Sequence, residues 1–118
     1  MEELRYVPVP KYSKEFVLKE LESGDTRRII EALLSISYDV DENWQFVQDL
    51  MIQYSDHSEK GIRYMAMLCF GNICRYHRTI DKGKVLPILE NGLKDNDACV
   101  RDGAEIALED IERFYEHP

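Results

Sequence analysis

The feature that most constrains this chain is an internal repeat with a period of 38 residues. Each copy holds two helix-length apolar stripes, and the stripes of one copy align with those of the next. A single pair of amphipathic helices cannot bury its apolar face, so successive pairs must stack on one another. The period therefore predicts an all-α solenoid of three helix pairs. The aligned segments are 62–73 with 100–111, 47–51 with 85–89 and, at a spacing of 37, 32–36 with 69–73.

The predicted helices fill most of the chain, and we treat residues 1–118 as a single domain. No segment sustains the alternation of apolar and polar residues that a half-buried strand requires. Residues 1–12 are predicted to be an extended lead, because Pro8 and Pro10 fix their own backbone angles and restrict the residues before them. The helix pairs are predicted over 13–40, 41–77 and 81–116, with helix starts at Ser13, Asp25, Asp41, Ser58 with Glu59, Asp81 and Asp95 or Asp97.

The chain is strongly acidic. Its 15 Lys and Arg residues against 23 Asp and Glu residues give a net charge of -8. Such a chain is repelled by nucleic-acid phosphates and anionic lipids unless basic residues are segregated, and no basic cluster is visible. No apolar run approaches the roughly 20 residues of a membrane-spanning helix, and the first residues lack the pattern of a signal peptide. We therefore expect a cytoplasmic protein that binds neither nucleic acid nor membrane.

The sequence holds little that points to catalysis. Cys69, Cys74 and Cys99 fall within apolar helical stripes, and free cysteine behaves as a small buried hydrophobe, so we expect all three to be buried. No C-x-x-C or H-x-x-x-H spacing favours a metal site, and no glycine-rich phosphate loop is present. We predict a protein that is not an enzyme and has no cofactor.

Two glycines lie inside predicted helices, at Gly71 and Gly103. Glycine in a helix interior costs about 1 kcal/mol relative to alanine, so each position calls for a reason. We expect close packing of neighbouring helices, with the approach of a partner's backbone as the alternative.

The second segment of each repeat carries a distinctive motif. The pattern [Val/Ile]-Arg-x-x-Ala-x-x-[Ala/Cys]-[Leu/Phe]-x-x-Ile, found at 62–73 and 100–111, resembles the second helix of HEAT-like repeats. Segment 85–97 resembles the first helix and turn of such a repeat. The resemblance covers 41–112 closely and 13–40 loosely, and it implies the same solenoid that the repeat period predicts.

The HEAT-like resemblance also implies particular roles in the last repeat. Pro87 stands where the first helix of such repeats commonly bends, and the turn aspartate Asp95 would pair with Arg101. The preceding repeat departs from this pattern, because His57 occupies the aspartate position opposite Arg63. That departure places the equivalent pair in doubt.

The order of residues from Arg63 to Ile111 is also similar to that of small bacterial HEAT-type proteins. Several of these are immunity proteins of contact-dependent growth inhibition and other polymorphic toxin systems, which neutralise toxins delivered by neighbouring cells. The resemblance implies that this chain, a monomer when free, binds a cognate protein toxin. The net charge favours a basic, nuclease-like toxin as that partner.

Acidic residues in the last predicted helix recur at spacings of three and four, so they share one face. A solvated helix face would explain them. The alternative is an acidic strip on the continuous surface that second helices of a solenoid build, where it would suit a basic partner. The strip consists of Asp102, Glu105, Glu109, Glu112 and Glu116.

Several aromatic residues lie at predicted helix ends or beside polar neighbours, outside the apolar stripes. Tyr and Trp are common among interface hot spots, although core packing accounts for them nearly as well. Tyr64 and Met67 are predicted to face away from the buried side of their helix. The predicted partner-binding residues are Tyr38, Asp39, Trp44, Tyr64, Met67, Asp102, Glu105, Glu109 and Glu112.

Other functions stay open at this point. A non-catalytic adaptor or scaffold would use the same surface without inhibiting its partner. An enzyme analogous to HEAT-like chromophore lyases would need an exposed, reactive cysteine or histidine. A DNA-binding solenoid would need a basic groove.

Overall fold

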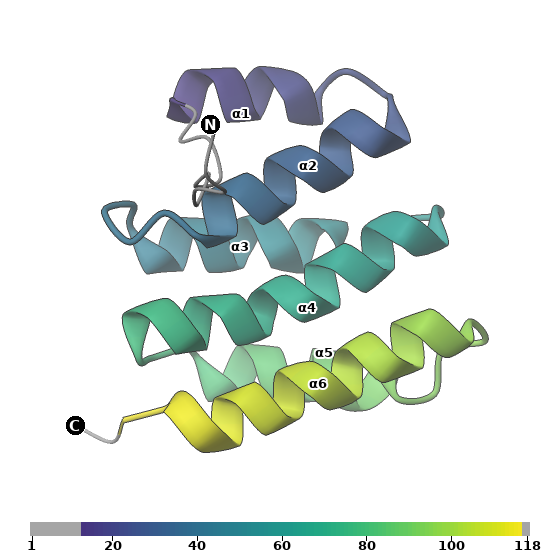
Figure 1. Cartoon of the computed structure of the whole chain (residues 1–118). Helices are drawn as coiled ribbons and strands as arrows, with labels where there is room; N and C mark the ends of the chain where they lie inside the picture. Colours follow the sequence, from purple (N-terminus) through teal and green to yellow (C-terminus); the bar gives the residue numbers. More distant parts are fainter. Residues whose placement is uncertain (1–12, 117–118) are drawn as a thin grey trace, which may run out of the picture.

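The computed structural model of the chain describes residues 13–116, which form six α-helices and no strand. The predicted all-α class and the three helix pairs are confirmed. The predicted extended lead over 1–12 lies outside the described residues. The helices are α1 (Lys14–Leu21), α2 (Thr26–Ser37), α3 (Trp44–Tyr54), α4 (Lys60–His77), α5 (Lys82–Gly92) and α6 (Ala98–Phe114) (Figure 1).

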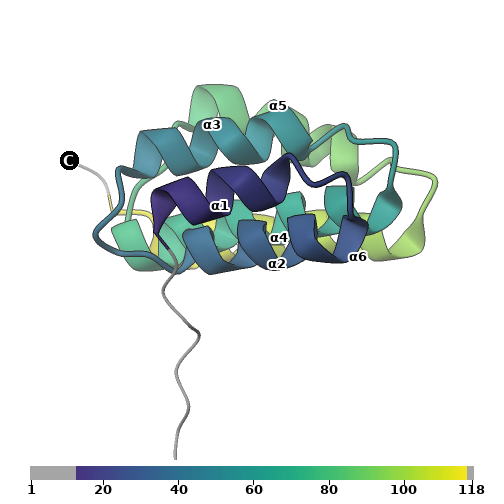
Figure 2. The ribbon, with the colours of Figure 1, turned by 90° about the horizontal axis from the view of Figure 1, so that it is seen from above.

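The second helices of the three pairs, α2, α4 and α6, lie side by side and form one layer (Figure 1). Helices α3 and α5 lie together on one side of this layer (Figure 2). Helix α1 lies at the end of the stack, beside α2. The first helix of each pair packs mainly on its own second helix, and few contacts join α3 to α5. The layer of first helices is therefore open between α3 and α5.

Most helices begin at a short polar side chain that accepts a hydrogen bond from an otherwise unpaired backbone N–H. The predicted caps Ser13, Asp25, Asp81 and Asp97 all do so. One predicted start is wrong: helix α3 begins after Asn43, whose side chain accepts from Phe46 N at 3.0 Å, and not after Asp41. Helix α4 begins after Glu59, one of the two residues predicted for its start, although the Glu59 side chain makes no capping hydrogen bond.

The apolar stripes meet between the two layers and form the core. Cys69 and Cys74 belong to this core, as predicted, and burial raises the pKa of the Cys69 thiol to about 12 and that of the Cys74 thiol to about 11. The largest fully buried side chains are Phe70, Leu33, Met51, Ile62, Ile73 and Leu89.

The third cysteine, Cys99, is exposed, so its predicted burial is wrong. It shares an outward face of α6 with Asp102 and Ile106, at spacings of three and seven residues, and all three are exposed.

Neighbouring repeats are joined at their turns by one arginine. Arg63 donates to both carboxylate oxygens of Asp95, at 3.0 and 3.1 Å, and to the carbonyl oxygens of His57 and Ser58. Arg101 interacts with Asp95 as predicted, but through the Asp95 carbonyl oxygen, to which it donates at 2.7 Å. The hydrogen bonds from Arg63 hold the pKa of Asp95 below its usual value.

Candidate functional site

The acidic strip of α6 lies at the carboxyl-terminal end of the stack, where no further helix pair covers it (Figure 1). Its residues Asp102, Glu105, Glu109, Glu112 and Glu116 are all exposed, and we call this surface the acidic end face. None of the five forms an ion pair with another residue of the range 13–116. The expected spacing of the carboxylates on one helix face is thus present in the structure.

The repeat explains where this face points. At a shift of 38, Glu105, Glu109 and Glu112 align with Met67, Gly71 and Cys74, which are buried in α4. Gly71 contacts α6 directly, since a Cβ there would lie 3.2 Å from the Cα of Ala107. The carboxylates thus occupy the positions that would pack against the next repeat if there were one. The end face closes the stack that the described helices form and is not part of the front surface that α2, α4 and α6 build together.

Two predicted binding residues on α4 point elsewhere than expected. Met67 is 3% exposed, so it does not face away from the buried side. Its sulfur would lie 3.0 Å from a Cβ at Gly92, which places it under α5. Tyr64 is half-buried, and the edge of its ring would lie 3.0 Å from a Cβ at Gly103. Tyr64 and Met67 are three residues apart, so they lie on the same face of α4. That face packs against the last helix pair, α5 and α6.

The remaining predicted residues gather on a different side of the molecule, where α2, α4 and α6 end and α3 and α5 begin (Figure 1). Tyr38 is the C-cap of α2, and Trp44 is the first residue of α3. The rings of Tyr38 and Tyr76 meet edge to face with centroids 5.5 Å apart. Asp39 accepts from the backbone N–H of Asp41 at 3.0 Å and so shapes the turn between them. We call this side the aromatic edge; its aromatic members are Tyr38, Trp44, Tyr76, Phe114 and Tyr115.

Basic side chains lie over the rings of the aromatic edge. The guanidinium carbons of Arg75 and Arg78 lie 4.6 and 5.2 Å from the ring centroid of Phe114. The ammonium of Lys82 lies 3.9 Å from the ring centroid of Tyr115. Cation–π contacts at such distances hold long side chains over a ring and reduce their freedom. The edge is therefore a preordered surface of aromatic and basic groups on a chain that is acidic overall.

The sequence contained a signal for this edge that the expected site missed. Tyr38, Tyr76 and Phe114 stand at successive intervals of 38 residues. The repeat therefore places one ring at the end of each second helix. Phe114, Arg75 and Arg78 are not among the predicted partner-binding residues.

The two surfaces meet at the end of α6, where Glu112 and Glu116 flank Phe114 in the sequence. Tyr38, Asp39 and Trp44 thus lie on the aromatic edge, and Asp102, Glu105, Glu109 and Glu112 lie on the acidic end face. The predicted set forms two adjoining surfaces, with Tyr64 and Met67 packed between repeats.

No cluster of three or more metal-ligating side chains occurs among residues 13–116. Over the same residues, no helix has the length and apolar character needed to cross a lipid bilayer. One buried polar atom in this range lacks a hydrogen-bond partner, the Nε2 of His77 near the end of α4.

The fold and these surfaces define a protein of stacked helix pairs. No family model and no curated protein sequence matches the chain. Among solved structures, the chain is similar to a chain in the "Crystal structure of CDI complex from Cupriavidus taiwanensis LMG 19424". The two share 23% sequence identity, and the alignment covers 97% of this chain and 100% of the other with a TM-score of 0.78. This likeness establishes a shared fold along nearly the whole chain.

Proposed function

We propose that this protein is a non-catalytic immunity protein that binds and neutralises a cognate toxin, as in contact-dependent growth inhibition. The observation that carries the proposal is the full-length correspondence of its fold with a chain of a CDI complex. The resemblance of the segment from Arg63 to Ile111 to bacterial immunity proteins points to the same role. The protein acts in the cytoplasm, where its toxin would have to be blocked.

The aromatic edge supplies the contact surface in this proposal. Interfaces are enriched in Tyr, Trp and Arg, and a few such side chains carry most of the binding energy. Tyr76 is 43% exposed, and its ring is held in place by Tyr38. A ring that is both accessible and preordered loses little conformational entropy when a partner covers it.

The adjoining acidic end face supplies the electrostatic attraction. Its five carboxylates are exposed and have no cation nearby to which they are paired within the described residues. Such a field accelerates association with a basic partner, which favours a nuclease-like toxin. The end face thus has a second role besides closing the stack.

The direct test is a titration with the carboxyl-terminal fragment of the protein encoded immediately upstream, with its nuclease activity followed in the same tube. We expect tight binding and loss of activity. Binding without loss of activity would instead favour an adaptor, and no binding would remove the proposal. Blocking an active site needs only an interface of roughly 800 Å² per partner, which a chain of this size can provide.

Two sets of variants separate the roles of the surfaces. The double variant Glu105→Lys with Glu109→Lys should slow association about tenfold at low salt. Its control, Glu15→Lys on α1 with Glu22→Lys at the C-cap of that helix, makes the same change of charge at the opposite end of the stack. Tyr76→Ala should raise the Kd about 30-fold by removing a hot-spot side chain. Its control is Leu93→Ala, which removes a side chain of comparable exposure (39%) after α5.

A further inference from the structure

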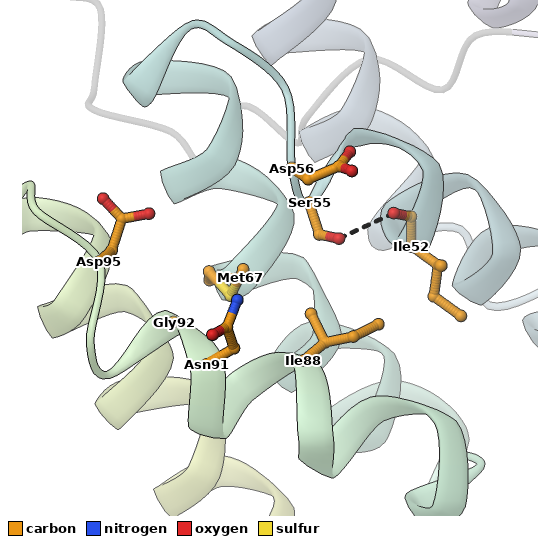
Figure 3. A pocket seen from close by; sticks show the side chains of 8 residues that line it. All are labelled: Ile52, Ser55, Asp56, Met67, Ile88, Asn91, Gly92 and Asp95. Carbon is orange, nitrogen blue, oxygen red and sulfur yellow. Dashed lines mark hydrogen bonds between the residues drawn. The ribbon is translucent and has the colours of Figure 1, made fainter.

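A groove runs between α3 and α5 on the side of the molecule away from the front of the second helices. It exists because these two first helices scarcely touch, so the α4 side chain between them forms its floor. That floor is Met67, which reaches under α5 because Gly92 has no side chain to exclude it. Figure 3 shows side chains from α3, α4 and α5 around this space. The groove, with apolar and polar side chains in its lining, holds about 290 Å³ and adjoins a more polar hollow of about 410 Å³ at the turns.

The lining combines an apolar floor with a rim of hydrogen-bond acceptors. Ile52 and Ile88 are half-buried and stand on either side of the space above Met67. Ser55 donates its hydroxyl proton to the carbonyl oxygen of Ile52 at 2.8 Å, so its own oxygen is left to accept (Figure 3). The Asn91 side chain forms no hydrogen bond with other described residues, and its carbonyl oxygen is a further acceptor.

The charge of the rim is carried by Asp56. The Asp95 carboxylate also lines the groove, but Arg63 neutralises it through two hydrogen bonds. Asp56 is exposed and forms neither an ion pair nor a hydrogen bond with any other residue between 13 and 116. The groove thus has one uncompensated negative charge beside a slot of apolar side chains.

We propose that this groove receives an arginine or lysine side chain from the partner protein. The aliphatic stem would lie on Ile52, Met67 and Ile88, and the cationic head would reach Asp56 and the acceptors beside it. Long basic side chains have this division between an apolar stem and a charged end. At about 290 Å³ the whole groove is at the lower limit of small-molecule pockets, roughly 300–1,000 Å³, so a side chain suits it better than a cofactor. This inference rests on the proposed function for the identity of the partner.

The site can be tested without the toxin by nuclear magnetic resonance. The probe is N-acetyl-arginine-N-methylamide, and its control is the uncharged citrulline analogue of the same shape. We expect the arginine probe to shift the methyl resonances of Ile52, Met67 and Ile88, and the citrulline probe to shift them at least about tenfold less at equal concentration. Equal shifts from both probes, or shifts confined to the acidic end face, would overturn the proposal.

Variants then tie the effect to one carboxylate. Asp56→Asn should remove the preference for arginine over citrulline while leaving the helical circular dichroism unchanged. Asp49→Asn changes an exposed residue of α3, the helix that precedes Asp56 in the chain, and should keep that preference because Asp49 does not line the groove. A preference that persists in Asp56→Asn would show that Asp56 does not select the cation.

Titration with the upstream-encoded toxin fragment separates this inference from the proposed function. Asp56→Asn should weaken toxin binding about tenfold, and Asp49→Asn should not. If the wild-type chain binds the toxin and Asp56→Asn binds it equally well, the groove is not the contact and the proposed function stands. If the wild-type chain fails to bind the toxin but the arginine probe still binds, the proposed function fails and the groove remains a cation site.

Discussion

Replacing Gly71 with alanine should destabilise the protein, although the same change in a free helix would stabilise it. Gly71 lies in the middle of α4 where it crosses α6, and these two helices pack more extensively than any other pair. A Cβ there would lie 2.7 Å from the Oδ2 atom of Asp110, 3.1 Å from its Cβ and 3.2 Å from the Cα of Ala107. The expected role of Gly71, close helix packing, is confirmed by these distances.

The size of the effect follows from three contributions. The Asp110 carboxylate can rotate away, which breaks its ion pair with the half-exposed Arg75 and costs about 0–1 kcal/mol. The contact with the Ala107 backbone can be relieved only if α4 and α6 separate slightly, and such overpacking costs about 1–3 kcal/mol. The gain in helix propensity returns about 1 kcal/mol. We therefore expect a net loss of about 1.5 kcal/mol in the free energy of unfolding.

Thermal unfolding followed by circular dichroism measures this loss. For a chain of this length, about 1.5 kcal/mol corresponds to a Tm lower by about 5–9 °C. The matched control is Gly83→Ala in the first turn of α5, where the added Cβ would meet only the Oδ1 atom of Asp81 at an ordinary 3.4 Å. The control should have a Tm equal to or slightly above that of the wild type. A Tm of Gly71→Ala as high as that of the control would refute the packing argument.

Three further predictions concern the turns, the cysteines and the end of the stack. Asp95→Ala should lower the free energy of unfolding in urea by about 2 kcal/mol, between the values for exposed and fully buried pairs, because Arg63 loses its carboxylate partner. Because the folded-state pKa of Asp95 is lowered, this stabilisation is present above the unfolded-state pKa of about 3.9 and is lost as the pH falls below it. If the free energy of unfolding fell equally with pH in the wild type and in Asp95→Ala, this prediction would be wrong. Alkylation of the native protein should modify Cys99 alone, and mass spectrometry showing label on either buried cysteine would contradict the assigned burial. The double variant Glu105→Met with Glu109→Gly places the equivalent packing residues of α4 on the end face. Analytical ultracentrifugation should then detect self-association that rises with concentration. A strictly monomeric variant would show that the carboxylates are not what prevents two end faces from associating.

The repeat period predicted the helix pairs because it records a requirement of stacking. Each second helix must bury an apolar residue at the same position, as α4 and α6 do with Ile62 and Val100. Helix starts were less predictable, because several polar residues in one turn can each accept a backbone hydrogen bond. Asp41 and Asn43 are both suitable, and the structure uses Asn43.

The predicted partner-binding residues stay a prediction, and the structure shows only how they are arranged. The acidic residues and the aromatic residues are present on the surface, but they lie on two adjoining faces instead of one front surface. Met67 appeared to face outward because Met65, Ala66 and Cys69 already filled one stripe. In a solenoid, an inner helix has a third neighbour, so a second side of α4 is buried by the last pair.

The sequence by itself determined the helix pairs, their period and the presence of an acidic face on the last helix. Those properties depend on residue spacing along one helix, and spacing is fully recorded in the chain. Only the tertiary structure decided which faces remain open, because exposure depends on neighbours far away in sequence. It thereby placed Glu109 at the uncovered end and Gly71, its equivalent 38 residues earlier, in the tightest helix contact. It also opened the groove above Met67, since only the packing shows that α3 and α5 leave a space between them.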